Sequence, residues 1–161
     1  MSESESGAFE TGDTPRIHPP TLAGLLLLGG LVLHLLGRHP HHPLVYPHQL
    51  VGLLIVAGGV ALMVYAAALF AARETTKTPY GNPTSFVVVM PYTFTRNPMY
   101  LGLATLLMGF AVFFASFAIL LAAVIFFVVI DRAVIPREEQ TMEWLFGQQY
   151  LDYKTRVRRW L

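Results

Sequence analysis

The chain has 161 residues, of which 54% are hydrophobic and 13% are charged, and its formal net charge is +1. Soluble domains carry roughly 25% charged residues, so this composition favours a single-domain membrane protein. A charge this balanced gives no reason to expect a nucleic-acid partner. The chain contains no cysteine, which excludes disulfides, cysteine-bound metals and cysteine nucleophiles.

Residues 1–20 differ in composition from the rest of the chain. They combine serine, glycine and proline with one arginine and the acids Glu3, Glu5, Glu10 and Asp13. This start lacks the basic region of a secretory signal. We predict a disordered acidic tail, because so polar a segment buries too little apolar surface to fold.

Three apolar regions come after the tail, at residues 21–36, 48–72 and 99–130. A helix that crosses a bilayer needs about 20 such residues. The third region runs for 32 residues without a charge, which is too long for one comfortable crossing and suits two short ones. We predict a helical hairpin with its turn near residues 114–117, around the polar Ser116. One long tilted helix is the alternative.

The predicted fold is therefore an all-α integral membrane protein with about four transmembrane helices. Residues 21–72 form two N-terminal spans, and residues 73–161 form a core of loop, hairpin and C-terminal helix. Four spans place ten of the eleven Lys and Arg residues on one side and Arg38 alone on the other. Because Lys and Arg mark the cytoplasmic side, both termini and the loop at 73–97 are predicted to be cytoplasmic.

The sequence Arg-Asn-Pro stands directly before the third apolar region. Asn97 suits the N-cap of a helix and Pro98 suits its first turn, so a helix is predicted to begin here at the cytoplasmic surface. The N-terminal end of a helix attracts anions. Arg96 adds a cation, and Tyr100 adds a ring and a hydroxyl. A helix start that binds no ligand explains the same residues.

A second polar cluster comes after the fourth predicted span. Asp131 and Arg132 lie at the end of that span, where ionisable groups are costly enough to indicate a partner or a task. Pro136 is predicted to interrupt the helix, and Glu138 and Glu139 occupy the first turn of the next helix. An ordinary surface helix is the alternative interpretation.

The tail of the chain shows apolar and aromatic residues at helical spacing. These residues are Met142, Leu145, Phe146, Tyr150, Tyr153 and Val157. Steps of three and four residues are typical of an amphipathic helix. We predict one such helix lying along the cytoplasmic membrane surface, since its Tyr, Trp and Arg content suits that location.

The two polar clusters fall on the same predicted side of the membrane. One offers a cation and helix N–H groups, and the other offers the carboxylates of Glu138 and Glu139. Together they complement a ligand that is both anionic and cationic. S-adenosylmethionine, with its carboxylate, ammonium and sulfonium groups, is such a ligand.

Four sequence features occur in a recognisable order over residues 73–160: RNPMYLG, the apolar hairpin, REE and FGQQYLDYKTRV. In order and spacing they resemble the isoprenylcysteine carboxyl methyltransferase family, which is related to membrane phospholipid methyltransferases. The resemblance implies a membrane methyltransferase that uses S-adenosylmethionine. Its acceptor would be a hydrophobic small molecule or lipid that enters from the bilayer and carries a carboxylate, thiol or amine.

The resemblance also implies roles for individual residues. Cofactor contacts are expected at Tyr92, Asn97, Pro98, Met99 and Tyr100 and along the stretch Thr84, Ser85, Phe86 and Val87. Arg96 and Glu139 are expected on the cofactor side, with Glu139 orienting nearby basic groups. Glu138 is expected to face the acceptor, where it is the candidate base for a thiol or amine. Arg132 and Arg137 are the candidate replacements for a substrate-side arginine.

Three positions depart from the family pattern. Asn97 stands where the family commonly has histidine, and Met90 stands where glycine is usual. Val134 fills the position of the substrate-side arginine. A prenylcysteine carboxylate needs a cation to bind it, so the third departure weakens the expectation of that acceptor more than the expectation of methyl transfer.

Two other functions fit the same sequence features. One is a non-catalytic membrane scaffold that keeps the fold for packing or partner binding. The other is a nicotinamide-dependent lipid reductase, which the lack of a further basic pocket for a dinucleotide makes the weaker choice. The histidine-rich run at residues 39–48 is not expected to bind a metal, because prolines interrupt it and no carboxylate accompanies it.

Overall fold

A computed structural model describes residues 18–37, 47–74 and 89–161, with the backbone alone described at 70–74. Most of the predicted acidic tail lies outside the described residues, as do His39, His41 and His42. The predicted cofactor stretch also lies outside them; it comprises Thr84, Ser85, Phe86 and Val87.

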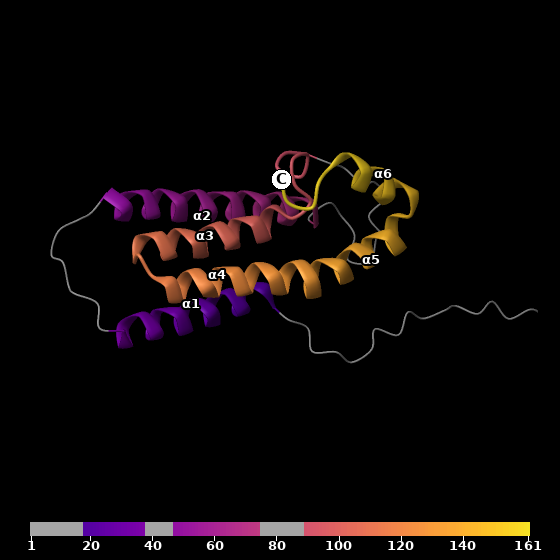
Figure 1. Ribbon diagram of the computed structural model, residues 1–161. Coiled ribbons are helices and arrows are strands. Elements are labelled where there is room, and N and C mark those ends of the chain that lie inside the picture. The colour runs from indigo at the N-terminus through magenta and orange to yellow at the C-terminus, as the bar shows by residue number, and fades with distance from the viewer. Residues whose placement is uncertain (1–17, 38–46, 75–88) are drawn as a thin grey trace, which may run out of the picture.

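Four apolar helices run side by side and form a bundle (Figure 1). They are α1 (Pro19–Leu36), α2 (Pro47–Glu74), α3 (Pro98–Phe113) and α4 (Phe117–Val129). Each of α1, α2 and the helix that includes α4 is long and apolar enough to cross a membrane. The 16 residues of α3 reach about 24 Å at 1.5 Å per residue, which makes it a short span. The prediction of an all-helical membrane fold is confirmed.

The predicted hairpin between α3 and α4 is also confirmed. Helix α3 ends at Phe113, α4 begins at Phe117, and Ala115 between them has a φ of 47°. The Ser116 side chain accepts a hydrogen bond from the Ile119 N–H at 3.3 Å. This contact satisfies one of the N–H groups that a helix start leaves free, so the polar residue in the apolar run marks the N-cap of α4.

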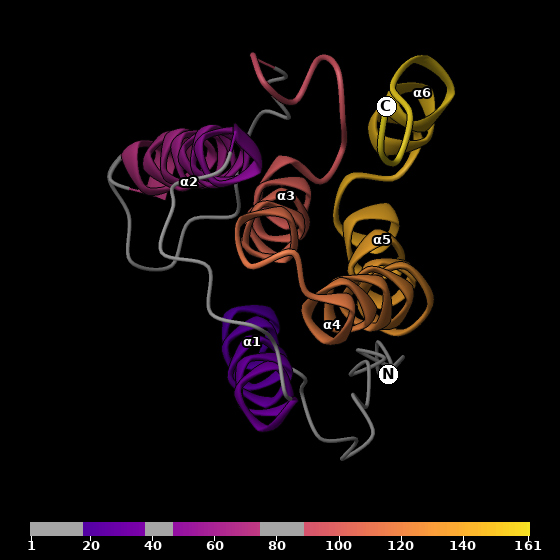
Figure 2. The same ribbon diagram turned by 60° about the vertical axis from the view of Figure 1, so that its left-hand side comes forward.

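Glycines bring α2 and α3 into backbone contact. A Cβ on Gly52 would lie 2.5 Å from the Phe113 nitrogen, and one on Gly59 would lie 2.7 Å from the Gly102 carbonyl oxygen. Small residues allow membrane helices to approach this closely. Figure 2 shows α3 between α2 and α4, with α1 beside α4. The bundle core comprises Ala23, Leu103, Leu107, Ala123, Phe126, Ile130 and Ile135.

The helix after α4 does not stop at Pro136, and that prediction is wrong. A π-helical turn, η1 (Ile130–Val134), joins α4 to α5 (Ile135–Phe146). Within it the Ile135 N–H bonds to the Ile130 carbonyl, five residues back. This wider turn comes directly before Pro136, which has no N–H to donate to the preceding turn. Glu138 and Glu139 therefore stay on a helix continuous with the fourth span.

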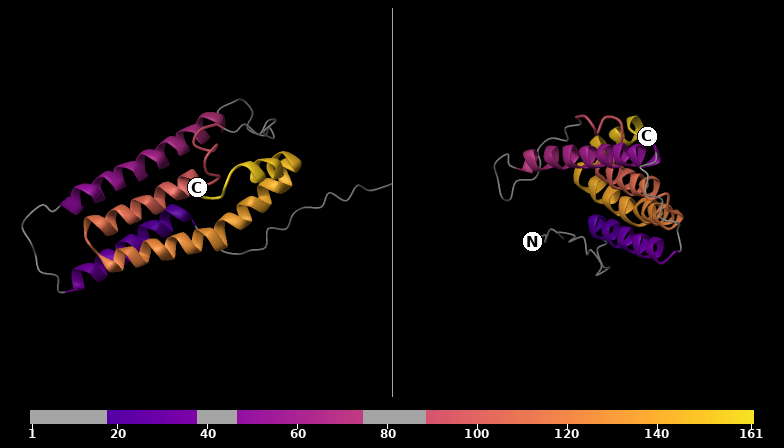
Figure 3. Two further views of the ribbon diagram at one scale, coloured as in Figure 1. Left: turned by 45° about the horizontal axis from the view of Figure 1, so that its top comes forward. Right: turned by 90° about the vertical axis from the view of Figure 1, so that its left-hand side faces the viewer.

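The single amphipathic tail helix is also corrected, since the tail forms two helices. Helix α5 ends at Phe146, the next residue Gly147 has a φ of 52° that suits glycine, and α6 (Gln148–Arg156) follows. Figure 3 shows α5 leading away from the bundle and α6 turned back toward α2 and α3. The sharp turn brings residues 157–161 over the start of α3 (Figure 1).

Candidate functional site

The predicted polar segments meet at one end of the bundle. Residues 89–97 lead into α3 there, and η1, α5, α6 and residues 157–161 surround that entry (Figure 1). We call this region the polar end. It brings together parts of the chain that lie more than 60 residues apart, as in the hydrogen bond from the Arg96 N–H to the Arg158 carbonyl at 3.0 Å.

A hydrogen bond joins the two predicted clusters directly. The Tyr100 hydroxyl donates to Glu138 Oε1 at 2.5 Å, from the first turn of α3 to the first turn of α5. The carboxylate is on the exposed side of α5, and the tyrosine is half-buried. The candidate base and the candidate cofactor residue therefore share one location, close enough to contact the same small molecule.

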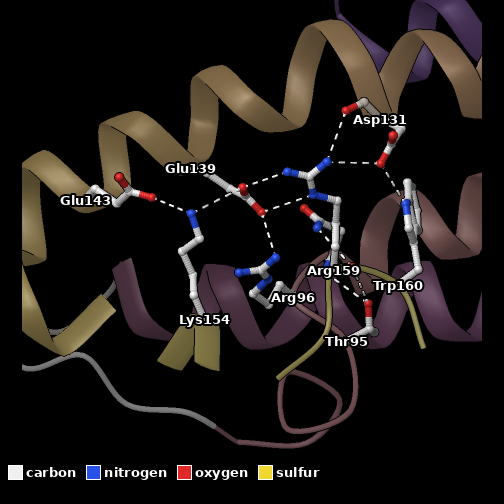
Figure 4. Close-up of polar contacts among 9 residues, drawn as sticks. Thr95, Arg96, Asp131, Glu139, Glu143, Lys154, Arg159 and Trp160 are labelled. Atoms are coloured by element: carbon white, nitrogen blue, oxygen red, sulfur yellow. Dashed lines mark hydrogen bonds and ion pairs between the residues drawn. The ribbon is translucent and has the colours of Figure 1, made fainter. Parts of the chain in front are cut away.

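Glu139 is the centre of a buried ion network (Figure 4). Its side chain is only 8% exposed, and its oxygens lie 3.1 Å from Arg96, 2.9 Å from Arg159 and 3.7 Å from Lys154. Burying one carboxylate is costly unless cations and hydrogen bonds compensate it. Glu139 thus holds the basic groups around it in place.

Arg96 is the least satisfied member of this network. Its side chain is 10% exposed, and one guanidinium nitrogen, Nη2, contacts Glu139. Its Nε and Nη1 atoms are buried and have no hydrogen-bond partner in the described structure. An unpaired buried donor costs about 1–3 kcal/mol, so these two nitrogens are the candidate donors to an acceptor group.

Asp131 anchors the opposite side of the polar end. Its Oδ1 accepts hydrogen bonds from Trp160 Nε1 at 2.9 Å and Arg159 Nη1 at 3.2 Å. Arg132 lies 3.2 Å from the other oxygen, with 83% of its side chain exposed, so these two sequence neighbours pair with each other. No contact of Arg132 with Tyr100 or Glu138 is found among the described residues. The structure therefore does not bring this candidate to the Tyr100–Glu138 pair.

Asn97 occupies the N-cap position of α3, as predicted, but its side chain does not cap the helix. Its Nδ2 instead donates to the Arg159 carbonyl at 3.1 Å, and the buried Thr95 hydroxyl donates to the same oxygen at 3.0 Å. Pro98 is buried at the first helical position, and Met99 comes after it, half-buried. The amide serves a long-range contact because residues 158–160 pass directly over the helix start.

Tyr92 is held at the site through its backbone. The Tyr153 hydroxyl on α6 donates to the Tyr92 carbonyl at 2.7 Å. Burial raises the pKa of Tyr153 to about 12, and burial likewise raises the pKa of Tyr150 to about 12. The Tyr153 hydrogen bond thus connects α6 to residues 89–97, and the raised pKa keeps its hydroxyl protonated at alkaline pH.

Sequence reasoning missed Thr95, Arg159 and Trp160. Hydrogen bonding to Glu139 raises the pKa of the Arg159 guanidinium, and the Trp160 ring lies 4.5 Å from that of Phe127 on α4. Nothing in the sequence indicates which of the adjacent residues Arg158 and Arg159 is exposed and which joins the ion network. In the structure the Arg158 side chain is exposed, whereas that of Arg159 points into the ion network.

Comparison with known proteins identifies the family of the chain. The family model described as phospholipid methyltransferase matches residues 47–149. An uncharacterized protein of Haemophilus influenzae is 40% identical over 63 residues, which cover 39% of this chain and 100% of that protein. No solved structure gives a significant match. The chain belongs to the phospholipid methyltransferase family of membrane proteins, which includes the isoprenylcysteine carboxyl methyltransferases suggested by the sequence motifs.

Proposed function

We propose that the protein transfers a methyl group from S-adenosylmethionine to a hydrophobic, lipid-like acceptor at the polar end. One observation carries the proposal. The Tyr100–Glu138 hydrogen bond of 2.5 Å joins two segments that were each expected to contribute to a methyltransferase site. Membership of the phospholipid methyltransferase family supports the same reaction class.

The charges of the polar end fit this methyl donor. The free Nε and Nη1 of Arg96 each offer an N–H donor, on different edges of the guanidinium, and either can donate to an oxygen of a carboxylate. The Glu138 carboxylate, exposed on α5, is suited to an ammonium or sulfonium group. A zwitterionic ligand satisfies both, whereas a simple anion would satisfy Arg96 alone.

The acceptor side is supported by an apolar groove between α3 and α4. One cavity of about 260 Å³ lies there, lined by Ala104, Met108, Ala123, Val124 and Phe127. Ala104 is one helical turn from Tyr100, so the groove ends beside the polar end. A lipid chain in this groove would place its head group near Glu138.

Methyl transfer asks this chain mainly to position an acceptor and to exclude water. The donor, when bound, supplies a methyl group on a positively charged sulfur. Tyr100 orients the Glu138 carboxylate, which accepts the proton of a thiol or amine acceptor. Arg132 is paired with Asp131, so we propose an amine or thiol acceptor in preference to a carboxylate.

Binding in detergent tests the proposal. Calorimetry should show that the purified protein binds S-adenosylmethionine, and Arg96→Gln should weaken that binding by about tenfold or more. Arg156→Gln is the matched control, because Arg156 is exposed on α6 and bonds to the Asp152 carbonyl nearby. If the wild type does not bind the compound, the proposal is wrong and a non-catalytic scaffold is favoured.

Activity tests the role of Glu138. Incubation of the protein with membrane lipids and radiolabelled S-adenosylmethionine should label a lipid fraction. At saturating donor concentration, Glu138→Gln should slow labelling by about 100-fold or more, the usual contribution of a positioned base. Glu143→Gln is the control, since Glu143 lies further along α5 and pairs with Lys154. Equal labelling by all three proteins contradicts the role.

We also propose that the polar end faces the cytoplasm, on the basis of the Lys and Arg distribution. The chain has no cysteine, so a single cysteine in place of the exposed Gln149 on α6 provides a unique label. A membrane-impermeant thiol reagent should label it in inverted vesicles and not in intact cells. Labelling in intact cells would reverse the orientation.

A further inference from the structure

Arg159 connects the segments of the polar end. Its guanidinium donates to Glu139 on α5 through Nη2 at 2.9 Å and Nε at 3.3 Å, and to Asp131 on η1 through Nη1 at 3.2 Å. Its backbone carbonyl accepts hydrogen bonds from Thr95 and Asn97 in the loop before α3. One residue therefore joins the loop, the π-helical turn and α5 (Figure 4).

These contacts fix Arg96 from two directions. Thr95 and Asn97, which bond to the Arg159 carbonyl, are the residues on either side of Arg96 in the chain. The Arg159 guanidinium contacts both oxygens of Glu139, whereas Arg96 contacts one of them with one nitrogen. A two-point contact sets the plane of a carboxylate. The orientation of Glu139, and hence that of Arg96, thus depends on Arg159.

We propose that Arg159 is a positioning residue for the methyl donor: it holds Arg96 so that an unpaired N–H of the Arg96 guanidinium faces the donor carboxylate. The inference rests on the proposed function, because it takes S-adenosylmethionine as the ligand of Arg96. Arg159 itself needs no contact with the ligand. Its six polar contacts within the described structure go to the protein, four from the side chain and two to the carbonyl.

The neighbouring arginine provides a matched control. The Arg158 side chain is exposed and donates to the Leu161 carbonyl at 3.4 Å. The backbone carbonyl of Arg158 accepts a hydrogen bond from the Arg96 N–H, and a substitution of the side chain leaves that bond in place. Arg158→Gln and Arg159→Gln remove the same charge at adjacent positions. Arg159→Lys keeps the charge and removes the two-point contact with Glu139.

Binding of S-adenosylmethionine to the four proteins is measured by calorimetry in detergent, at a temperature where circular dichroism shows each to be folded. Arg159→Gln should raise the Kd by about tenfold or more, and Arg159→Lys should fall between it and the wild type. Arg158→Gln should change the Kd by less than about twofold, as expected for an exposed charge. Equal Kd values for Arg159→Gln and the wild type would overturn the inference, as would equal losses for the two glutamine variants.

Hydrogen exchange separates this inference from the proposed function. The backbone N–H of Asn97 donates to the Thr95 hydroxyl at 3.2 Å. Loosening of residues 95–97 would break this bond and expose the N–H to solvent. Exchange across residues 95–97 should be about tenfold faster in Arg159→Gln than in Arg158→Gln, because the lost contacts lower the cost of local opening. Unchanged exchange overturns the positioning role even if the wild type binds the donor. A wild type that binds no donor ends the proposed function, and the exchange result then decides whether Arg159 holds the loop.

Discussion

The α2–α3 interface and the polar end are held together in opposite ways. At the interface, Gly52 and Gly59 remove side chains so that two backbones touch. At the polar end, long side chains from several segments converge on the buried carboxylate of Glu139. The α2–α3 interface depends on glycines that have no side chain, and the polar end depends on ion pairs between a buried carboxylate and several cations.

This difference explains where the protein can place chemistry. A backbone contact between apolar helices leaves no room for a ligand and needs no partner beyond the two helices. The charge network around Glu139 contains N–H donors without an acceptor, namely Nε and Nη1 of Arg96. Rigid apolar packing therefore supports the polar end, which contributes the groups of the proposed site.

Removing the centre of the charge network should have the largest effect. Glu139→Ala leaves Arg96 buried without its counter-ion, and breaking a buried ion pair in this way costs about 3–5 kcal/mol. The free energy of unfolding in detergent measures the loss. Glu143→Ala is the control: its pair with Lys154 is half-exposed, and such pairs contribute about 1 kcal/mol or less. Equal losses would show that burial of Glu139 is unimportant.

Adding one methyl group to the glycine interface should rank second. Gly52→Ala would place a Cβ 2.5 Å from the Phe113 nitrogen, and such overpacking costs about 1–3 kcal/mol. A Cβ on Gly58 of the same helix would meet no atom within 4 Å, so Gly58→Ala should be neutral or stabilising by up to about 1 kcal/mol. Thermal unfolding of the two variants compares them. A loss in both would point to glycine flexibility instead of close packing.

The Ser116 N-cap is a polar contact within the apolar bundle, and its removal tests whether packing alone stabilises that region. Ser116→Ala removes the N-cap of α4 at the hairpin turn, which should cost about 1 kcal/mol. Thr141→Ala removes an exposed hydroxyl bonded to the Arg137 carbonyl within α5 and should change stability by less than about 0.5 kcal/mol. Chemical unfolding in detergent distinguishes these outcomes. A neutral Ser116→Ala would mean that apolar packing alone sets the turn.

The smallest expected effect concerns α6 and the loop it holds. Tyr153→Phe removes the hydrogen bond to the Tyr92 carbonyl, at a cost of about 0.5–1.5 kcal/mol. Folding raises the pKa of Tyr153 from 10.0 to about 12, so its contribution is complete below pH 10 and is lost as the pH rises through 12. Alkaline unfolding of the variant should accordingly be shallower than that of the wild type. Tyr65→Phe, on the exposed face of α2, should leave the alkaline profile unchanged.

Local sequence signals predicted much of this fold. Two long apolar regions predicted α1 and α2 to within two residues at each end. The uncharged run and its Ser116 predicted the hairpin, and Asn97-Pro98 predicted the start of α3. Each of these signals acts over a few neighbouring residues or over the thickness of a membrane, so a linear sequence contains it.

The same local signals failed at three places in the chain. Asn97 was expected to cap α3, but its amide bonds to Arg159, 62 residues away. Pro136 was expected to end a helix, but a π-helical turn carries the helix past it. The tail was expected to be one helix, but Gly147 divides it and turns α6 back over the site. A distant segment decided the first outcome, whereas the π-helical turn and the glycine break are local backbone features that the sequence reasoning missed.

The sequence by itself determined that the chain is a membrane bundle with two polar clusters of methyltransferase type, because hydropathy and motif spacing are properties of short segments. Only the tertiary structure decided that Glu139 binds Arg96, Lys154 and Arg159, and that Arg96 keeps two free nitrogens. Ion pairs between residues far apart in the chain form when helices bring them within a few ångströms. Which arginine is buried and which is exposed is set by that approach, since Arg158 and Arg159 are chemically identical.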